Sequence, residues 1–205
     1  MNILAIGAHP DDIEFGCGGT LAKYAQKGHN IYMLVLTDGS YGGEAEVRKK
    51  EQEESARYLR VKELFWGNIK DTELLESRRL IVAIEDIVNK VRPDIVFANY
   101  PEDVHQDHRA ASKAAVSATR YIKEVLFFEV PTTCGFDPDI FVDIEEVLGY
   151  KLRLLRLHSS QVNKVKVADL TILQSAQSCA NFRGYQGRVK YAEGFKALRL
   201  LREIT

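Results

Sequence analysis

Six side chains that can bind a metal ion or move a proton gather at two places in the sequence. The first group is His9, Asp11 and Asp12, and the second is His105, Asp107 and His108. A catalytic zinc ion typically takes three protein ligands from His, Asp and Glu and leaves one position for water. His9 and Asp12 with one histidine of the second group supply that number. The sequence therefore allows a metal site that activates water for hydrolysis.

The two histidines of the second group are three residues apart. Residues at this spacing lie on the same side of a helix, so His105 and His108 can face one site if a helix begins there. One of them can then bind the metal while the other stands beside the reacting group. His29 and His158 are predicted to be structural or surface residues, with His158 a candidate to support the site.

Alternating strands and helices must position these groups. Strands are expected at residues 2–7, 31–37, 62–66, 94–99, 124–130 and 140–144, where short apolar runs occur. Helices are expected at residues 13–27, 44–60, 76–91, 109–122, 144–157 and 164–179, and the tail 188–205 is ambiguous between helix and strand. Parallel strands need crossovers, which helices supply, so this alternation predicts an α/β fold with a Rossmann-like, doubly wound, mainly parallel sheet flanked by helices.

Both chemical groups follow strands that such a sheet places side by side. In the common strand order 3-2-1-4-5-6, the first and fourth strands are neighbours where the winding reverses, and ligands bind outside their carboxyl ends. Residues about a hundred positions apart would therefore form one site. The glycine-rich loop after the second strand, at residues 38–43, ends at the same edge and is followed by Arg48.

Composition narrows the class of protein. The length of 205 residues favours a single domain over residues 1–205. The 28 basic and 29 acidic residues nearly balance, so the sequence predicts no strong net charge that would attract nucleic acid or an anionic membrane. Three separated cysteines predict thiols in a reducing compartment, and Cys17 is expected to be a small buried residue rather than a ligand. No apolar run is long enough for a membrane span. We expect a cytoplasmic protein that acts on a small molecule.

The two motifs also carry a family resemblance. Ala8-His9-Pro10-Asp11-Asp12 with His105-Gln106-Asp107-His108 resembles the zinc-dependent N-acetylglucosaminyl deacetylases, called PIG-L or LmbE-like, which include enzymes of bacillithiol and mycothiol biosynthesis. Also similar are the segments 16–22, 37–39, 158–161 and 191–195, and Arg48 with Glu51. Many members have glutamate directly after the Asp-Asp pair. Here Ile13 holds that position and Glu14 follows, as in the short bacillithiol-type branch, whose substrate is N-acetylglucosaminyl malate.

The resemblance implies a role for each residue. His9, Asp12 and His108 would bind one Zn²⁺ per chain, with Fe²⁺ as an alternative metal. Asp11 would be the general base, and His105 would stabilise the oxyanion. The position of Asp107 in the same turn adds, independently of the resemblance, a carboxylate that could keep His105 charged and oriented. Either Asp11 or His105 would protonate the leaving amine. Arg48 and Tyr191 would contact an amino-sugar substrate, and relatives form homo-oligomers, including hexamers.

Three other functions compete with this interpretation. A nucleotide-binding module is opposed by Asp11 and Asp12, which would repel a pyrophosphate, and by glycines at 16, 18 and 19 that lack the G-x-G-x-x-G spacing. A metal-dependent hydrolase of another amide or ester and a non-catalytic sugar-binding protein both stay open.

Overall fold

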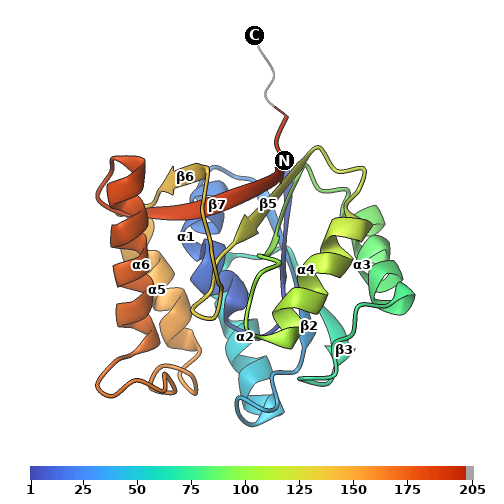
Figure 1. Cartoon of the computed structure of the whole chain (residues 1–205), viewed down its shortest axis with the longest axis horizontal. Coiled ribbons are helices and arrows are strands. Elements are labelled where there is room, and N and C mark those ends of the chain that lie inside the picture. The colour runs from blue at the N-terminus through green and yellow to red at the C-terminus, as the bar shows by residue number, and fades with distance from the viewer. Residues whose placement is uncertain (202–205) are drawn as a thin grey trace.

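A computed structural model describes residues 1–201 and contains one mixed sheet flanked by helices (Figure 1). The strands are β1 (Asn2–Gly7), β2 (Asn30–Thr37), β3 (Glu63–Ile69), β4 (Ile95–Asn99), β5 (Glu124–Phe128), β6 (Ile140–Asp143) and β7 (Ala192–Arg199). The helices are α1 (Asp12–Gln26), α2 (Ala45–Leu59), α3 (Arg78–Val91), α4 (Gln106–Ala118), α5 (Leu148–Leu157) and α6 (Ile172–Gly187), with a 3₁₀ turn at Glu145–Val147.

The strand order is β3-β2-β1-β4-β5-β7-β6. The first five strands in sequence are mutually parallel, and β7 pairs antiparallel with both β5 and β6. The predicted doubly wound, mainly parallel α/β fold is therefore confirmed, and strands β1 and β4 are neighbours as expected. The predicted order differs at one place, because β7, from the ambiguous tail, inserts between β5 and β6.

Two hydrophobic cores cover the two faces of the sheet. Ile3 and Ala5 of β1 point into the core beneath α1, α2, α5 and α6, whereas Leu4 and Ile6 point into the core beneath α3 and α4. Figure 1 shows this division, with α3 and α4 on one side and α5 and α6 on the other. Successive strand residues face opposite sides, so a strand buried on both faces is apolar throughout. This explains the uninterrupted apolar runs in the sequence.

Some element boundaries differ from the predicted ones. The helix expected at 164–179 begins only at Ile172, because Thr171 and Gln174 form a capping box that fixes its start. The helix expected at 109–122 begins earlier, at Gln106, because the His105 ring caps it. The helix expected at 144–157 opens with a 3₁₀ turn. The ambiguous tail is strand β7 through Arg199, and its last four residues, 202–205, lie outside the described chain.

The glycines at the start of α1 allow close packing of this helix. A Cβ at Gly16 would lie 2.0 Å from the Phe128 ring, and one at Gly19 would lie 2.9 Å from Ile144. No side chain fits at such separations without moving the neighbour. These glycines therefore bring α1 against β5 and the 144–147 turn, which accounts for them without a phosphate loop.

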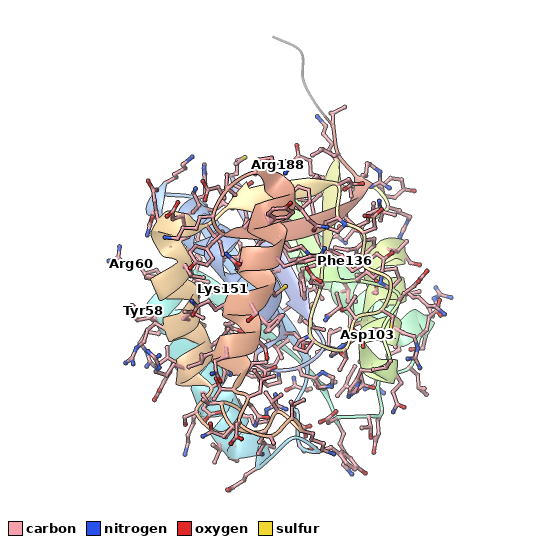
Figure 2. All side chains as sticks on the ribbon, turned by 60° about the vertical axis from the view of Figure 1, so that its left-hand side comes forward. Tyr58, Arg60, Asp103, Phe136, Lys151 and Arg188 are labelled. Atoms are coloured by element: carbon pink, nitrogen blue, oxygen red, sulfur yellow. The ribbon has the colours of Figure 1, made fainter. Side chains whose placement is uncertain are left out.

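A buried ion pair joins α5 to β7 and α1. The Lys151 ammonium lies 2.5 Å from a Glu193 carboxylate oxygen, and the two Glu193 oxygens accept the backbone N–H groups of Gly19 and Thr20. Figure 2 shows Lys151 beside the α5 and α6 ribbons. Both side chains are buried.

Replacing Lys151 by Met is expected to lower the free energy of unfolding by about 3–5 kcal/mol, because the Glu193 carboxylate would stay buried without its counter-charge. Denaturant titration measures this loss. Lys190→Met is the matched control, since Lys190 pairs with Glu145 at the exposed surface, where a pair contributes about 0–1 kcal/mol. Equal effects of the two substitutions would contradict the structural role of the buried pair.

The three cysteines are free thiols with different exposure. Cys17 is buried, as predicted, and burial raises the pKa of its thiol; burial also raises the pKa of Cys179 to about 12. Cys134 is exposed. Because a thiol reacts as thiolate, a thiol-specific disulfide reagent at pH 8 is expected to label Cys134 rapidly and the other two only after denaturation. A Cys134→Ser variant that keeps the rapid phase would contradict this.

Candidate active site

The loop after β1 places the first chemical group at the sheet's switch point. The Asp12 carboxylate accepts the backbone N–H of His9 at 2.9 Å, so the loop closes on itself. Asn99, at the end of β4, accepts the N–H of Ala8 at 3.1 Å and donates its amide to Asp12 at 3.4 Å. The neighbouring strands β1 and β4 therefore share polar contacts where they end.

Three potential ligand atoms from the two groups converge beside this loop. His9 Nδ1 lies 3.0 Å from His108 Nε2, His108 Nε2 lies 3.3 Å from Asp12 Oδ2, and His9 Nδ1 lies 3.6 Å from Asp12 Oδ2. Zinc binds imidazole nitrogen and carboxylate oxygen at about 2.0–2.2 Å, so two ligands in a tetrahedral site lie about 3.3 Å apart. The three separations match that value, and all three side chains are buried. The donor set fits a zinc ion.

Carboxylates hold the other nitrogen of each ring. His9 Nε2 lies 3.0 Å from Asp71 Oδ1 and 3.2 Å from Asp107 Oδ2. His108 Nδ1 lies 3.1 Å from Asp103 Oδ2, and Figure 2 shows Asp103 beside α4. Histidines that bind metals usually donate their second N–H to a carboxylate or carbonyl, which fixes the ring and its tautomer. Both histidines have this arrangement.

His9 also belongs to two other groups of possible ligands. The buried set His9, Asp71 and Asp107 and the set His9, His105 and His108 each bring three ligand atoms within 4.8 Å of one another. A divalent metal fits the first of these, on the Nε2 side of the His9 ring. The site is therefore rich in ligand atoms on both sides of one imidazole.

Positive charge is favoured at this position. Burial by itself lowers the pKa of His108, but Asp12 and Asp103 outweigh burial and raise it to about 9. The pKa of His9 is raised in the same way, because Asp107, Asp12 and Asp71 together outweigh its burial. A cation bound among the same nitrogens would displace their protons.

Asp11 lies between His9 and Asp12 in sequence, but its side chain points toward Arg48. Its backbone has a positive φ of 95°, and its carboxylate accepts a hydrogen bond from Arg48 Nη2 at 3.1 Å. Burial raises the pKa of Asp11, while the Arg48 charge acts in the opposite direction. A raised pKa makes this carboxylate a better proton acceptor near neutral pH.

Arg48 is buried and is therefore not a solvated surface charge. Besides Asp11, its guanidinium donates to the carbonyls of Gly39 at 2.9 Å and Pro10 at 2.5 Å. These bonds tie α2 to the loops that follow β1 and β2. Arg48 lies beside the predicted base and also lines the cavity described below.

His105 is half-buried next to His9 and His108. Its Nδ1 accepts the backbone N–H of Asp107 at 3.2 Å, which leaves Nε2 to carry a hydrogen. Burial and the neighbouring His9 and His108 lower its pKa. The Asp107 carboxylate contacts His9 and the N–H of Thr72, not His105. The carboxylate of Asp107 therefore contacts His9, whereas its backbone N–H orients the His105 ring.

A cavity of about 370 Å³ opens over these groups. Its lining comprises His9, Asp11, Asp12, Tyr41, Gly42, Arg48, Asp71, His105, His108, Val130, Pro131, Thr132 and Ile172. Tyr191 lies elsewhere, in the lining of a surface cavity beside α6. His158 is buried, with Nε2 3.5 Å from Glu14, and so lies behind the site rather than in it.

Sequence reasoning missed Asp71 and Asp103. Each follows a strand, β3 or β4, at the same edge of the sheet as the predicted ligands, and each holds a histidine of the site. Their position after parallel strands was the available signal. Carboxylates are common in loops, so that signal alone does not single them out.

Comparison with known proteins places the chain in a family. Residues 4–119 match the PIG-L family of GlcNAc-PI de-N-acetylases, and the chain belongs to this family. The diacetylchitobiose deacetylase of Thermococcus kodakarensis is 32% identical over 95% of this chain and 82% of its own. An uncharacterized deacetylase of Escherichia coli, YaiS, is 39% identical over 77% of this chain and 90% of its own.

Solved structures share the fold. The conserved protein TT1542 of Thermus thermophilus superposes with a TM-score of 0.88 at 26% identity, covering 98% of this chain and 96% of that one. The N,N'-diacetylchitobiose deacetylase of Pyrococcus horikoshii superposes with a TM-score of 0.83 at 29% identity, covering 96% and 83%. The relatives named as deacetylases support, at family level, deacetylation of N-acetylglucosamine-type substrates.

Proposed function

We propose that this chain is a zinc-dependent hydrolase that removes the N-acetyl group from an N-acetylglucosamine conjugate. The observation that carries the proposal is the triangle of His9 Nδ1, Asp12 Oδ2 and His108 Nε2, with both rings held by carboxylates. Asp11 and His105 line the same cavity. Family membership and the deacetylases among the relatives support the choice of an acetamide as the bond.

Each residue has a role in this proposal. His9, Asp12 and His108 would hold the metal, which when bound would lower the pKa of water to about 7 and polarise a carbonyl. Asp11 accepts the proton of the water that attacks the acetyl carbon. The Nε2–H of His105 donates a hydrogen bond to the oxygen that becomes negative. The C–N bond then breaks, giving acetate and an amine that takes its proton from Asp11, which received one from the water, or from His105 in its protonated form.

Asp107 and Arg48 position this machinery. Asp107 acts through His9, whose Nε2–H it accepts at 3.2 Å. Arg48 holds the Asp11 carboxylate at 3.1 Å and, from the cavity wall, also faces substrate hydroxyls or a carboxylate such as that of N-acetylglucosaminyl malate. Tyr191, placed away from this cavity, contacts substrate only if the conjugate reaches the surface beside α6.

Acetate release from a panel of conjugates tests the proposal. N,N'-diacetylchitobiose, N-acetylglucosaminyl malate and an inositol conjugate would be incubated with protein purified without chelator. We expect acetate and the free amine in equal amounts from at least one conjugate, and none after dialysis against a chelator until Zn²⁺ or Fe²⁺ is restored. Binding without release would favour a sugar-binding protein, and release only from other amides or esters would favour another hydrolase.

The protein's partners and assembly are also part of the proposal. The substrate is a small amino-sugar conjugate, and the chain assembles as a homo-oligomer, for which gel filtration gives the number of copies. Within residues 1–201, no helix combines the length and apolar character that crossing a membrane requires.

A further inference from the structure

Two side chains of α2, one helical turn apart, hold Asp11 from opposite ends. Arg48 donates to the Asp11 carboxylate and to the carbonyl of Pro10. Gln52 Oε1 accepts the backbone N–H of Asp11 at 3.2 Å. Residues four apart lie on the same helical face, so α2 presents both groups to the start of α1 together.

The Gln52 side chain is itself fixed from behind. Its Nε2 donates to Glu14 Oε1 at 2.7 Å, and the hydroxyl of Ser55 donates to the same oxygen at 2.7 Å. The side chains of Glu14, Gln52 and Ser55 are fully buried. Among the described ion-pair contacts, the Glu14 carboxylate has one partner, His158, whose Nε2 lies 3.5 Å away. A buried hydrogen bond of this kind is costly to leave unmade. The amide therefore has one orientation, with oxygen toward Asp11 and nitrogen toward Glu14.

Asp11 needs this support because of its backbone. A φ of 95° is uncommon for any residue except glycine and persists only where the surroundings hold it. The N–H that Gln52 accepts belongs to this strained residue. Moving the N–H moves the carboxylate that follows it on the same Cα.

We infer that Gln52 is a positioning residue for Asp11, acting as a bridge from the Glu14 carboxylate to the Asp11 N–H. The inference rests on the proposed function, in which Asp11 accepts the proton of the attacking water. The Gln52 amide supplies both contacts at once, because it accepts with its oxygen and donates with its nitrogen. Among the side-chain hydrogen bonds of the described residues, Gln52 reaches the cavity lining at Asp11 alone.

Gln52→Glu tests the bridge with almost no change of shape. Its second oxygen would face Glu14 at the distance of the lost hydrogen bond, where the two carboxylates repel each other when both are ionised. We expect kcat to fall roughly 10- to 100-fold, the loss typical of a slightly misplaced catalytic group, while KM changes less than about twofold. Gln52→Ala removes both contacts and adds no charge, and it should likewise lower kcat while changing KM little.

Exchanging the residues at positions 14 and 52 is expected to restore the activity lost in Gln52→Glu. In the double variant Gln52→Glu with Glu14→Gln, the amide at position 14 donates to the carboxylate at 52, whose other oxygen accepts the Asp11 N–H. Activity should return to within about threefold of the original protein. Ser55→Ala is the matched control, because it removes a 2.7 Å bond to the same Glu14 oxygen without touching Asp11; its kcat should stay within about twofold.

Crystal structures of these variants separate the inference from the proposed function. Asp11 should leave its φ near 95° in Gln52→Glu and recover it in the double variant, whether or not any conjugate is hydrolysed. If the original protein releases no acetate, the proposed function fails and these structures still decide the role of Gln52. An unchanged Asp11 in Gln52→Glu, a failed rescue, or an equal loss in Ser55→Ala would overturn the inference.

Discussion

Asp11→Asn is expected to lower kcat about 1000-fold while the protein keeps its metal. The amide cannot accept a proton from water, and general-base catalysis contributes roughly 10²- to 10⁴-fold. The proposed ligand atoms belong to His9, Asp12 and His108. The Asp11 carboxylate lies against Arg48 instead. Steady-state acetate release and elemental analysis of the same sample measure the two quantities together.

The control for this substitution is Asp86→Asn, on the exposed face of α3, which should leave kcat unchanged. An Asp11→Asn enzyme with full activity would refute the role of Asp11 as base. Loss of both metal and activity would instead make Asp11 a ligand, contrary to the geometry.

His108→Ala is expected to remove both the metal and the activity. The substitution removes one of the three proposed ligand atoms, and Asp12 and Asp103 lose the imidazole that lies between them. We expect bound metal to fall from about one per chain to a few per cent, with acetate release below about 1%. Elemental analysis after gel filtration measures the metal content.

The matched control is His29→Ala. His29 lies far from the site, with Nδ1 3.2 Å from the terminal amine, and its loss should change neither quantity. Full metal occupancy in His108→Ala would show that the ion binds elsewhere, with the set of His9, Asp71 and Asp107 as the alternative.

The sequence predicted most of the fold because its strands are buried on both faces. The apolar runs at β1, β2 and β4 are typical of buried parallel strands. Because β1 and β4 are neighbours in the sheet, His9 Nδ1 lies 3.0 Å from His108 Nε2, although the two residues are 99 positions apart in sequence. The start of α6 and the pairing of β7 escaped prediction. A capping box fixes the start of α6. The sequence of β7 shows neither a clear helical period nor a clear alternation of apolar and polar residues.

Contacts between side chains were harder to predict than the identity of the groups. The sequence placed Asp107 near His105 because both lie in one turn, but the carboxylate turns to His9 instead. The sequence does not single out Gln52, because a glutamine within a charged helix is usually solvated. Its role depends on α2 packing against the start of α1, which no local pattern encodes.

Anomalous X-ray diffraction at the zinc edge, from crystals of protein purified without chelator, tests the central claim most directly. We predict one anomalous peak per chain, about 2.0–2.2 Å from His9 Nδ1, Asp12 Oδ2 and His108 Nε2. With Fe²⁺ bound, the same peak would appear at the iron edge. A peak on the Nε2 side of His9, between Asp71 and Asp107, or no peak at either edge, would contradict the metal site on which the proposed function stands.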